Sequence, residues 1–406
     1  MSTLRPENPD QVRDAVAWAA AEEAPLEIVG LGSKRGLGRP FQASHSLDLS
    51  ALAGISLYEP EELVMTAGAG TRLAEVEARL ADQGQELAFE PVDLGPLLGA
   101  PDGAQTVGGV IACNLAGPRR IKVGAARDHF LGVKAVSGRG EAFKSGGRVV
   151  KNVTGYDLCK LLAGSHGTLA VMTEITVKVL PAPETSSTVL VFGLDDPTAV
   201  QALTQALQSP SEVSGAAHLP AALATAFAVA RVAGAGASVT AVRVEGVAPS
   251  VAYRAGALKD RLGAFGEIGE LDDGDSATLW REIRDVRPFV EDRDRQVWRL
   301  SVPPAAGPGV VEEIGQTVDA LAYYDWGGGL IWLAVAPGPD AAHEAVRGAV
   351  KPSGGHATLI RASDDVRTRV PVFPVQSDAL AELTRRVKDS FDPRRILNPG
   401  RMYAGM

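Results

Sequence analysis

The most regular hydrophobic pattern in the chain is an alternation over residues 168–180, which predicts a β-strand that Pro181 and Pro183 terminate. Apolar residues at helical spacing after Asn8 and Pro9 predict a first amphipathic helix that ends near Glu22. The same reasoning predicts strands at 26–31, 47–49 and 63–67, a helix capped by Thr71 and stopped at Gly84, a hairpin over 131–144 and a helix over 157–163.

A different rhythm follows Pro181 and Pro183, which mark a predicted domain boundary. Strands are predicted at 188–192, near 213, and at 238–245, 296–302, 330–335 and 357–360, and helices at 196–208, after Pro220, and at 250–262, 277–286, 310–321 and 341–350. Helices this short favour an α+β arrangement of ferredoxin-like units on one antiparallel sheet. A helix over 378–388 and the segment FDPRRILNPGR follow.

The first of two glycine-rich turns, GLGSKRGLG at residues 30–38, connects a predicted strand to another strand. A Rossmann fingerprint requires a helix to open from its glycine turn, so that fold is excluded here. Backbone N–H groups in such a curve, together with Ser33, Lys34 and Arg35, can nevertheless hold a pyrophosphate. A basic pair in a surface turn is usually solvated, but its place directly after a strand favours phosphate contact.

The second glycine-rich turn is QTVGGVIACNLAG at residues 105–117. Thr106 is predicted to cap a helix that begins with Gly108 and Gly109. Because these glycines have no side chains, a bulky dinucleotide can approach the backbone there. Read together, the two turns predict a site for one flavin dinucleotide.

Composition narrows the classes of function. A chain of 406 residues exceeds what one hydrophobic core usually spans, so at least two domains are expected. The formal net charge of −9 gives no overall positive field for nucleic acid or anionic lipid. No apolar stretch is long enough for a transmembrane segment, and the first residues lack the pattern of a secretory signal. A cytoplasmic protein is expected.

Cysteine and histidine contribute little predicted chemistry. The two cysteines, Cys113 and Cys159, lie in apolar segments and are interpreted as buried free thiols, too few for a disulfide framework or a thiolate cluster. The six histidines are scattered, without ligand spacing to another histidine or cysteine. No metal site is predicted.

Five segments together resemble the FAD-linked oxidase family of the vanillyl-alcohol-oxidase type: GLGSKRGLG, QTVGGVIACNLAG, VGAARDHFLG, KNVTGYDLCKLLAGSHGTLAVMTEITVKVLP and FDPRRILNPGR. LWREIRDVRPF, WRLSVPP, DWGGGLIWL and GGHATLIR are similar to cap segments of the FAD-binding E subunits of bacterial glycolate oxidases. The resemblance covers nearly the whole chain. It implies a PCMH-type FAD-binding domain at 1–183, a ferredoxin-like cap domain over the flavin ring at 184–370, and a segment at 371–406 that returns to the FAD domain.

The resemblance also implies which residues bind the cofactor. The pyrophosphate loop would comprise Gly30, Gly32, Ser33, Lys34, Arg35 and Gly36, while Thr106, Val107, Gly108 and Gly109 would contact the pyrophosphate and ribityl chain, and Asn114 and Gly117 would lie toward the ring. Arg127 and Asp128 resemble an RD pair of the family, and Gly164, Gly167, Thr168 and Val171 its second cofactor-binding strand. Asn398 and Arg401 would reach the flavin from the C-terminal segment.

Two positions depart from the family pattern. His166 stands where relatives usually carry Glu, and Ala170 stands where they usually carry Gly, so contacts there are expected to differ. Some relatives tether the flavin through a histidine or cysteine, but residues 30–38 contain neither. FAD is therefore expected to bind non-covalently.

Flavin chemistry asks little of the protein beyond positioning the substrate and accepting a proton, because the cofactor takes the electrons. A 2-hydroxy acid would need a cationic clamp for its carboxylate and a base near its hydroxyl. Arg361 and Arg299 are the clamp candidates and His356 the candidate base. An arginine on a strand is, however, often part of a solvated or salt-bridged face.

The resemblance implies a FAD-binding subunit of a glycolate oxidase complex, which oxidises glycolate or a similar 2-hydroxy acid to the 2-oxo acid. Its expected partners are a homologous catalytic flavoprotein subunit and an iron–sulfur subunit, through which any contact with the inner membrane would be made. The predicted cap shows no histidine cluster with a nearby acid, as found in relatives that act alone. Two alternatives stay open: a self-sufficient FAD-dependent 2-hydroxy-acid oxidoreductase, and a non-catalytic structural partner.

Overall fold

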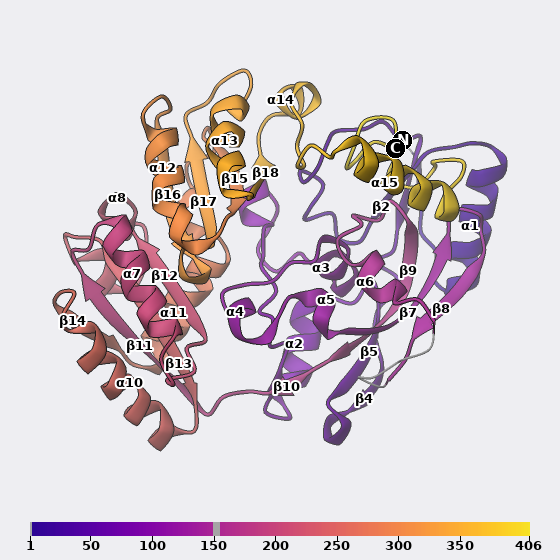
Figure 1. Ribbon diagram of the computed structural model, residues 1–406. Helices are drawn as coiled ribbons and strands as arrows, with labels where there is room; N and C mark the ends of the chain where they lie inside the picture. Colours follow the sequence, from indigo (N-terminus) through magenta and orange to yellow (C-terminus); the bar gives the residue numbers. More distant parts are fainter. Residues whose placement is uncertain (1, 149–154) are drawn as a thin grey trace. The chain divides into compact units, whose positions relative to one another are not determined.

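The computed structural model describes residues 2–148 and 155–406, which form two compact units (Figure 1). Unit 1 is made of Met1–Ala116, Gly124–Pro181 and Val375–Met406, and unit 2 of Gly117–Val123 and Ala182–Pro374. The chain therefore enters unit 2 twice. The sequence division placed residues 117–123 and 182–183 in the first domain and 371–374 in the last segment, whereas all three stretches pack in unit 2. The first four residues of the KNVTG match, 151–154, lie outside the described residues.

Unit 1 contains a parallel sheet in which β3 (His45–Asp48) lies between β1 (Ser2–Leu4) and β2 (Leu26–Val29). Residues 30–44, between β2 and β3, form turns and no helix, so the glycine loop joins strand to strand as predicted. A second, antiparallel sheet has the order β4 (Ile55–Glu59), β5 (Val64–Gly68), β9 (Ala170–Lys178), β7 (Phe130–Ser137) and β8 (Ala142–Gly146).

The first hydrophobic core of unit 1 joins the two ends of the chain. α1 (Pro9–Ala21) begins at the predicted cap, where Asn8 Oδ1 accepts a hydrogen bond from the Gln11 N–H. Its buried face packs with β2 and β3, and Ile396 and Leu397 from the C-terminal segment lie in the same core. The C-terminal segment is thus fixed beside the strand from which the glycine loop emerges.

A second core of unit 1 lies between the antiparallel sheet and its helices. Leu73, Val76 and Leu80 point into this core from α2 (Leu73–Ala81), as predicted, and Val107, Val110 and Ile111 do so from α3 (Val107–Cys113). The remaining helices of the unit are α5 (Ala126–His129), α6 (Leu158–Leu162) and α15 (Asp378–Phe391), and β6 (Gln85–Glu86) pairs with β10 (Leu180–Pro181).

Two local predictions in unit 1 are corrected by the structure. Thr71 does not cap α2, because Arg72 occupies the N-cap position and the Thr71 hydroxyl donates to Gly68 O at 2.7 Å. The strand predicted from residue 168 begins at Ala170, because Thr168 closes a turn in which its N–H donates to Ser165 O at 3.0 Å.

Unit 2 is built on one antiparallel sheet of eight strands, which agrees with the α+β prediction. The strand order is β14 (Ile268–Leu271), β11 (Thr185–Phe192), β13 (Val239–Gly246), β12 (Gly215–Leu219), β16 (Ala320–Asp325), β17 (Leu330–Val335), β15 (Gln296–Ser301) and β18 (His356–Arg361). Its helices are α4 (Arg120–Val123), α7 (Asp196–Leu207), α8 (Ala221–Ala224), α9 (Ala230–Ala233), α10 (Ala248–Leu262), α11 (Asp273–Arg284), α12 (Gly307–Gly315), α13 (His343–Val350) and α14 (Asp364–Arg369).

Two strands of unit 2 were not predicted. The predicted helix 310–321 ends at Gly315, and β16 follows, since its pairing with β12 and β17 overrides the helix-forming residues Ala320 and Leu321. β14 is an edge strand that contains Gly269, a poor strand former. Helix α10 packs on β11 and β13 over a core of valine, leucine and alanine side chains (Figure 1).

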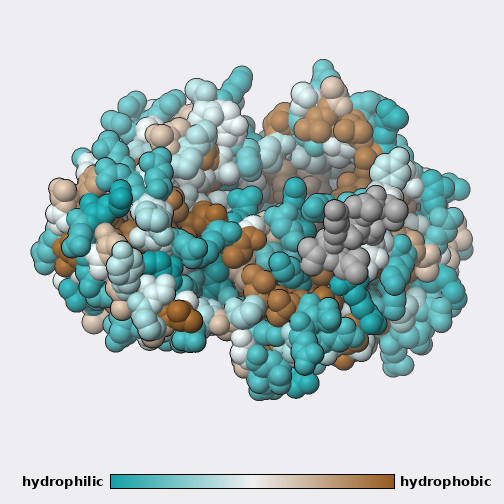
Figure 2. Space-filling view, turned by 60° about the horizontal axis from the view of Figure 1, so that its bottom comes forward, coloured by the Kyte–Doolittle hydropathy of each residue, from teal (hydrophilic) through white to brown (hydrophobic). Residues whose placement is uncertain are grey.

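On the face that Figure 2 shows, hydrophilic residues predominate and hydrophobic ones gather in separate small groups. Among the helices that the structure describes, none is long and apolar enough to cross a membrane.

Candidate cofactor site

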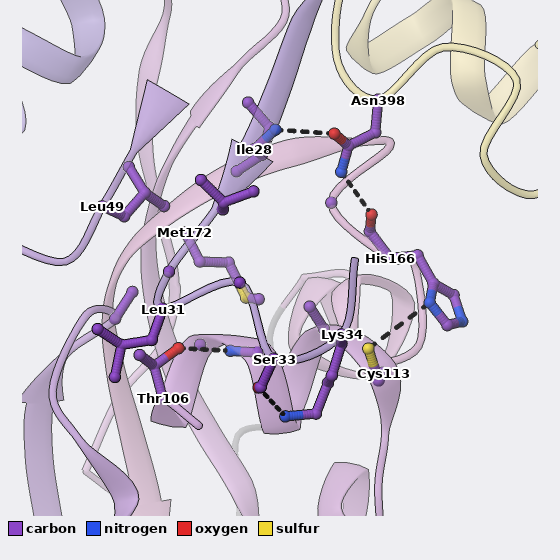
Figure 3. Close-up of a pocket in the computed structure, with 18 of the residues that line it drawn as sticks. Ile28, Leu31, Ser33, Lys34, Leu49, Thr106, Cys113, His166, Met172 and Asn398 are labelled. Carbon is purple, nitrogen blue, oxygen red and sulfur yellow. Dashed lines mark hydrogen bonds between the residues drawn. The ribbon is translucent and has the colours of Figure 1, made fainter. Parts of the chain in front are cut away.

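A cavity of about 740 Å³ opens in unit 1 where four segments of the chain meet (Figure 3). These segments are the end of β2 with the glycine loop, α3 with its cap residue Thr106, the turn before β9 with the start of that strand, and the C-terminal segment. This volume includes the mouth of the cavity, which is open to solvent. Its lining combines apolar side chains with polar and charged groups: Ile28, Val29, Gly30, Leu31, Gly32, Ser33, Lys34, Arg35, Leu49, Ala69, Thr106, Gly108, Gly109, Ala112, Cys113, His166, Gly167, Ala170, Met172, Asn398 and Arg401.

The glycine loop is held as a tight turn at the cavity wall. Gly32 has a φ of 76°, a conformation that glycine adopts without strain, and its carbonyl accepts the Arg35 N–H at 3.2 Å. The Leu37 N–H donates to Lys34 O at 3.0 Å. The backbone N–H groups of Ser33 and Lys34 donate to no acceptor in the part of the chain that the structure describes. Two donors therefore remain for a ligand.

Lys34 supplies a buried positive charge at this wall. Lys34 is only 7% exposed, and its Nζ donates to Gln105 Oε1 at 3.1 Å and to Ser33 Oγ at 3.4 Å. Burial lowers the pKa of Lys34, while the nearby carboxylate of Asp93 opposes that shift. An anionic ligand beside the ammonium would stabilise its charged form. Arg35, by contrast, is about half exposed and pairs with Glu27 Oε1 at 3.1 Å.

The start of α3 offers a ligand room beside the backbone, but few free backbone N–H donors. Thr106 caps the helix as predicted, with its Oγ1 accepting the Gly109 N–H at 3.2 Å. The N–H groups of Val107 and Gly108 are used within the protein, because they donate to Thr71 O at 3.0 Å and to Ala69 O at 2.9 Å. This part of the site is therefore shaped by the absence of side chains.

The glycines around the cavity differ in what a side chain at each position would contact. A Cβ on Gly108 would lie 2.7 Å from Ala69 O, and one on Gly30 would lie 2.6 Å from Thr106 Oγ1, so both allow segments of the protein to pack. A Cβ on Gly109 would meet only Thr106 Oγ1 at 3.4 Å and Lys34 Nζ at 3.8 Å. Gly109 is thus the one of these three whose missing side chain leaves room beside the lysine.

The C-terminal segment holds the other parts of the site together. Asn398 Oδ1 accepts the Ile28 N–H and its Nδ2 donates to His166 O, both at 2.8 Å (Figure 3). Arg401 donates from Nη2 to Lys34 O at 2.8 Å. Both residues were expected to reach the flavin. Their side chains line the cavity while tying β2, the turn before β9 and the glycine loop to one another.

A buried ion pair fixes this segment and was missed by the sequence interpretation. Lys388 Nζ donates to Asp392 Oδ2 at 2.7 Å, to Thr168 O at 2.6 Å and to Leu397 O at 3.0 Å. Asp392 in turn accepts the N–H groups of Ile396 and Leu397 at 3.1 and 2.8 Å. The signal was present as an aspartate four residues after a lysine on a helix, but it is indistinguishable from a surface pair without the fold.

Cys113 and His166 also line the cavity, with Sγ and Nδ1 3.6 Å apart. Burial, with a further contribution from Arg401, lowers the pKa of His166 to about 3, so this histidine is neutral at physiological pH. Burial raises the pKa of Cys113, although Lys34 and Arg401 oppose the shift. The pair is therefore an uncharged wall of the site.

Several predicted cofactor residues lie in unit 1 but not among those that line the cavity. Asn114 ends α3 with a φ of 52° and its Oδ1 accepts the Arg127 N–H at 3.0 Å. Asp128 Oδ2 accepts the Ala125 N–H at 2.9 Å within the first turn of α5. Val171 is fully buried in the first core. The others in this group are Gly36, Val107, Arg127, Gly164 and Thr168.

Gly117 belongs to unit 2, where its carbonyl accepts the Trp326 Nε1–H at 3.1 Å. The contact fixes the short segment 117–123 on unit 2. Among the described residues, no group of three or more histidine, cysteine or acidic side chains is placed to hold a metal ion.

Arg361 is a structural residue in this fold. Its guanidinium donates to Arg295 O from Nε at 3.1 Å and from Nη2 at 2.8 Å, to Phe289 O at 2.7 Å and to Asp292 O at 2.5 Å. These bonds close the loop that precedes β15. The predicted role as a substrate clamp does not fit a guanidinium so fully occupied by backbone carbonyls.

Arg299 and His356 lie on neighbouring strands of unit 2, Arg299 on β15 and His356 on β18. Arg299 is partly buried and His356 is exposed. Burial, then the charges of Arg299 and Arg120, lower the pKa of His356. The two candidates are thus close enough to interact electrostatically, which the sequence could not show.

Comparison with known proteins identifies the family. Residues 2–146 match a family model described as an FAD binding domain. The glycolate oxidase subunit GlcE of Escherichia coli K12 is 34% identical over 392 residues, which cover 96% of each chain. The chain belongs to the GlcE family. It is therefore a FAD-dependent oxidoreductase or a subunit of one.

More distant similarities extend to a D-lactate dehydrogenase and to the solved structure of an oxidase. The D-lactate dehydrogenase of Archaeoglobus fulgidus is 26% identical, covering 98% of this chain and 90% of its own. The solved structure of 4-ethylphenol oxidase from Gulosibacter chungangensis superposes with a TM-score of 0.71 at 15% identity, covering 99% of this chain and 89% of that chain. This confirms the vanillyl-alcohol-oxidase type of fold.

The cavity of unit 1 fits the FAD of this family. Ser33 and Lys34 offer backbone donors and Lys34 a buried cation, which suit a pyrophosphate. Leu31, Leu49 and Met172 provide apolar walls for a ring system (Figure 3). The room beside Gly109 lets a bulky ligand approach the backbone.

Proposed function

We propose that this chain is the FAD-binding subunit of a complex that oxidises glycolate, or a similar 2-hydroxy acid, to the 2-oxo acid. The observation that carries the proposal is the cavity of unit 1, in which the glycine loop, α3 and the C-terminal segment converge on Lys34 in a chain of the GlcE family. Bound FAD supplies the acceptor for the electron pair of the oxidised C–H bond.

The chain's own residues bind and orient the cofactor in this proposal. The Lys34 ammonium and the backbone N–H groups of Ser33 and Lys34 bind the pyrophosphate. Gly109 leaves room for it beside the lysine. Asn398 and Arg401 act as positioning residues, because they fix the loop and the turn that line the cavity.

The flavin is held without a covalent bond. Cys113 and His166 line the cavity, but burial raises the pKa of the Cys113 thiol, and a protonated thiol is a poor nucleophile. Residues 30–38 contain no cysteine or histidine. Precipitation of the purified protein with acid should therefore release the yellow colour into the supernatant.

The partners in this proposal are a homologous catalytic flavoprotein subunit and an iron–sulfur subunit. The relative from Escherichia coli is itself called a subunit, and this chain has only two cysteines, too few to ligate an iron–sulfur cluster alone. Expression of a tagged chain from its natural host, followed by purification and a spectrum, tests this. Recovery of the chain with FAD and with partners that carry iron supports the proposal, and recovery of a lone, colourless chain contradicts it.

A second candidate is a self-sufficient oxidoreductase, favoured by the full-length similarity to a D-lactate dehydrogenase. The two candidates differ in the activity of the isolated chain. As a subunit, the FAD-loaded chain reduces an artificial electron acceptor slowly when given glycolate or D-lactate. Rapid turnover by the chain alone would select the second candidate.

A further inference from the structure

The loop that precedes the second glycine-rich turn, residues 93–103, is closed by one carboxylate. Asp93 is only 7% exposed, and its Oδ1 accepts the Gly95 N–H at 2.9 Å. Its Oδ2 accepts the Gly103 N–H, also at 2.9 Å. The first bond forms a local turn of the kind that aspartate favours, and the second joins the two ends of the loop. Asp93 therefore determines where residue 103 lies.

The closed loop is a neighbour of the glycine loop at residues 30–38. A Cβ on Gly95 would lie 3.6 Å from Ser33 Cβ, and one on Gly36 would lie 3.6 Å from Leu98 Cδ2. No residue of 93–103 is among the described residues that line the cavity. The loop thus supports the wall of the site from outside, and other residues form the wall itself.

The end of the loop leads directly to the residue that contacts Lys34. Gly103, which Asp93 fixes, is followed two positions later by Gln105, whose Oε1 accepts a hydrogen bond from Lys34 Nζ at 3.1 Å. Thr106 then caps α3. Asp93 therefore acts on the cavity by two routes, through the glycine loop that it supports and through the chain that it directs to Gln105.

Asp93 also acts on Lys34 by its charge. Its carboxylate favours the ammonium form of Lys34, whereas burial lowers the pKa of that lysine. The other titratable residues that line the cavity, among those described, carry no negative charge at neutral pH: Arg35 of the glycine loop, Cys113 of α3, His166 of the turn before β9 and Arg401 of the C-terminal segment. Without Asp93, the buried ammonium would lie among neutral and positive groups.

We propose that Asp93 is a positioning residue for the FAD site, which closes the loop 93–103 against the glycine loop and holds a negative charge near the Lys34 ammonium. Asp93 does not line the cavity, so its effect passes through Lys34 and Gln105. The inference rests on the proposed function, because the pyrophosphate of FAD is the anion that the ammonium would bind.

The test is the FAD affinity of the flavin-free full-length chain, measured by fluorescence titration from pH 7 to pH 9.5. Affinity falls once the pH exceeds the pKa of Lys34 in the flavin-free chain, because deprotonation removes the charge that binds the pyrophosphate. In Asp93→Asn the fall should begin about 1 pH unit lower than in the wild type, since the favourable carboxylate is gone. Combined with Lys34→Met, Asp93→Asn should add no pH dependence.

Asp102→Asn is the matched control, because it removes an exposed carboxylate from the same loop and should keep the wild-type pH profile. The packing of the loop is tested at Gly95, where a Cβ would lie 3.0 Å from Asp93 Oδ1 and 3.1 Å from Pro101 O. Gly95→Ala displaces the loop but keeps the charge, so it should lower FAD affinity by roughly 5-fold at every pH without moving the profile.

The ionisation of Lys34 can also be followed without FAD, by carbon-13 NMR of the flavin-free chain labelled at lysine Cε, with Lys34→Met for assignment. The pKa of Lys34 should be lower in Asp93→Asn than in the wild type. Melting temperatures report folding, and Asp93→Ser, which can still form the local turn to Gly95, is a second uncharged variant.

Two results would overturn the proposal: an unchanged pKa of Lys34 in the uncharged variants, or an equal change of the pH profile in Asp102→Asn. A wild-type chain that takes up no FAD would count against the proposed function. The NMR titration would still decide whether Asp93 sustains the charge of Lys34.

Discussion

Lys34 Nζ lies 3.1 Å from Gln105 Oε1, so one hydrogen bond joins the two glycine-rich turns at a buried cation. The two residues are 71 positions apart in the chain, and Lys34 is the one lysine among the described residues that line the cavity. This contact makes one ligand site from two loops.

Replacement of Lys34 should weaken FAD binding. Lys34→Met removes a charge-assisted hydrogen bond to the pyrophosphate, which is worth about 1.5 to 3 kcal/mol, or roughly 10- to 100-fold in affinity. Fluorescence titration of the flavin-free protein with FAD measures the change. Arg35→Met is the matched control, because Arg35 is exposed and paired with Glu27, and should change the affinity by less than about 3-fold. Equal effects of the two variants would contradict the assigned role of Lys34.

The two neighbouring glycines of α3 should respond differently to alanine. At Gly108 the new Cβ would press on Ala69 O at 2.7 Å, so Gly108→Ala should cost about 1 to 3 kcal/mol of folding free energy. At Gly109 the new Cβ meets only ordinary contacts, and alanine favours the helix by up to about 1 kcal/mol.

Gly109→Ala should therefore keep or raise the melting temperature of the flavin-free chain while lowering its affinity for FAD. Thermal unfolding and FAD titration of both variants separate packing from ligand space. If Gly109→Ala bound FAD as the wild type does, the ligand would not approach the backbone at this point.

The parts of the site that follow from local backbone chemistry could be predicted from the sequence. The left-handed Gly32, the cap at Thr106 and the strand-to-strand loop are each determined by a few adjacent residues. The resemblance to FAD-linked oxidases could likewise be recognised from motifs of this kind. Such features can be recognised without knowledge of the fold.

The remaining features depend on contacts between distant segments. The sequence does not show that Arg361 is enclosed by the carbonyls of residues 289–295, or that residues 117–123 pack in unit 2 and bring Arg120 to Trp326. The predicted helix 310–321 overlaps the start of β16 for the same reason, since only the pairing of β16 with β12 and β17 makes it a strand. The sequence alone does not show whether backbone carbonyls, an indole ring or water surround an arginine.

Loss of the buried lysine of α15 should disturb both stability and cofactor binding. Lys388→Met leaves the fully buried Asp392 carboxylate without its cation, which typically costs about 3 to 5 kcal/mol. Because the same pair anchors the segment that carries Asn398 and Arg401, FAD affinity should fall as well.

Urea unfolding measures the stability of Lys388→Met, and Arg385→Met serves as its control. Arg385 pairs with Glu382 on the surface of the same helix, so its loss should cost less than about 1 kcal/mol. A Lys388 variant as stable as the Arg385 variant would show that the buried pair does not anchor the segment.

The pH dependence of the protein's free energy of unfolding should reflect the protonation of His166. Its pKa is lowered to about 3 in the folded chain, against an ordinary value near 6.5, so the unfolded chain binds the additional proton as the pH falls. The contribution of neutral His166 to the free energy of unfolding is fully present above pH 6.5 and is lost as the pH falls from 6.5 to 3. At pH 5 the loss from this residue is about 2 kcal/mol.

Replacement of His166 by asparagine removes this titration. The free energy of unfolding of His166→Asn, followed by urea unfolding from pH 7 to pH 5, should fall less steeply than that of the wild type. Identical slopes would mean that His166 takes up its proton as readily in the folded chain as in the unfolded one.

The central claim is that unit 1 binds FAD and holds it without a covalent bond, and the absorption spectrum of the purified chain before and after acid precipitation tests it most directly. The account predicts flavin bands in the native protein and, after acid, a colourless pellet with FAD in the supernatant. A colourless native protein that takes up no added FAD would contradict the site. A yellow pellet would contradict the non-covalent attachment and point to Cys113 or His166, the thiol and imidazole that line the cavity.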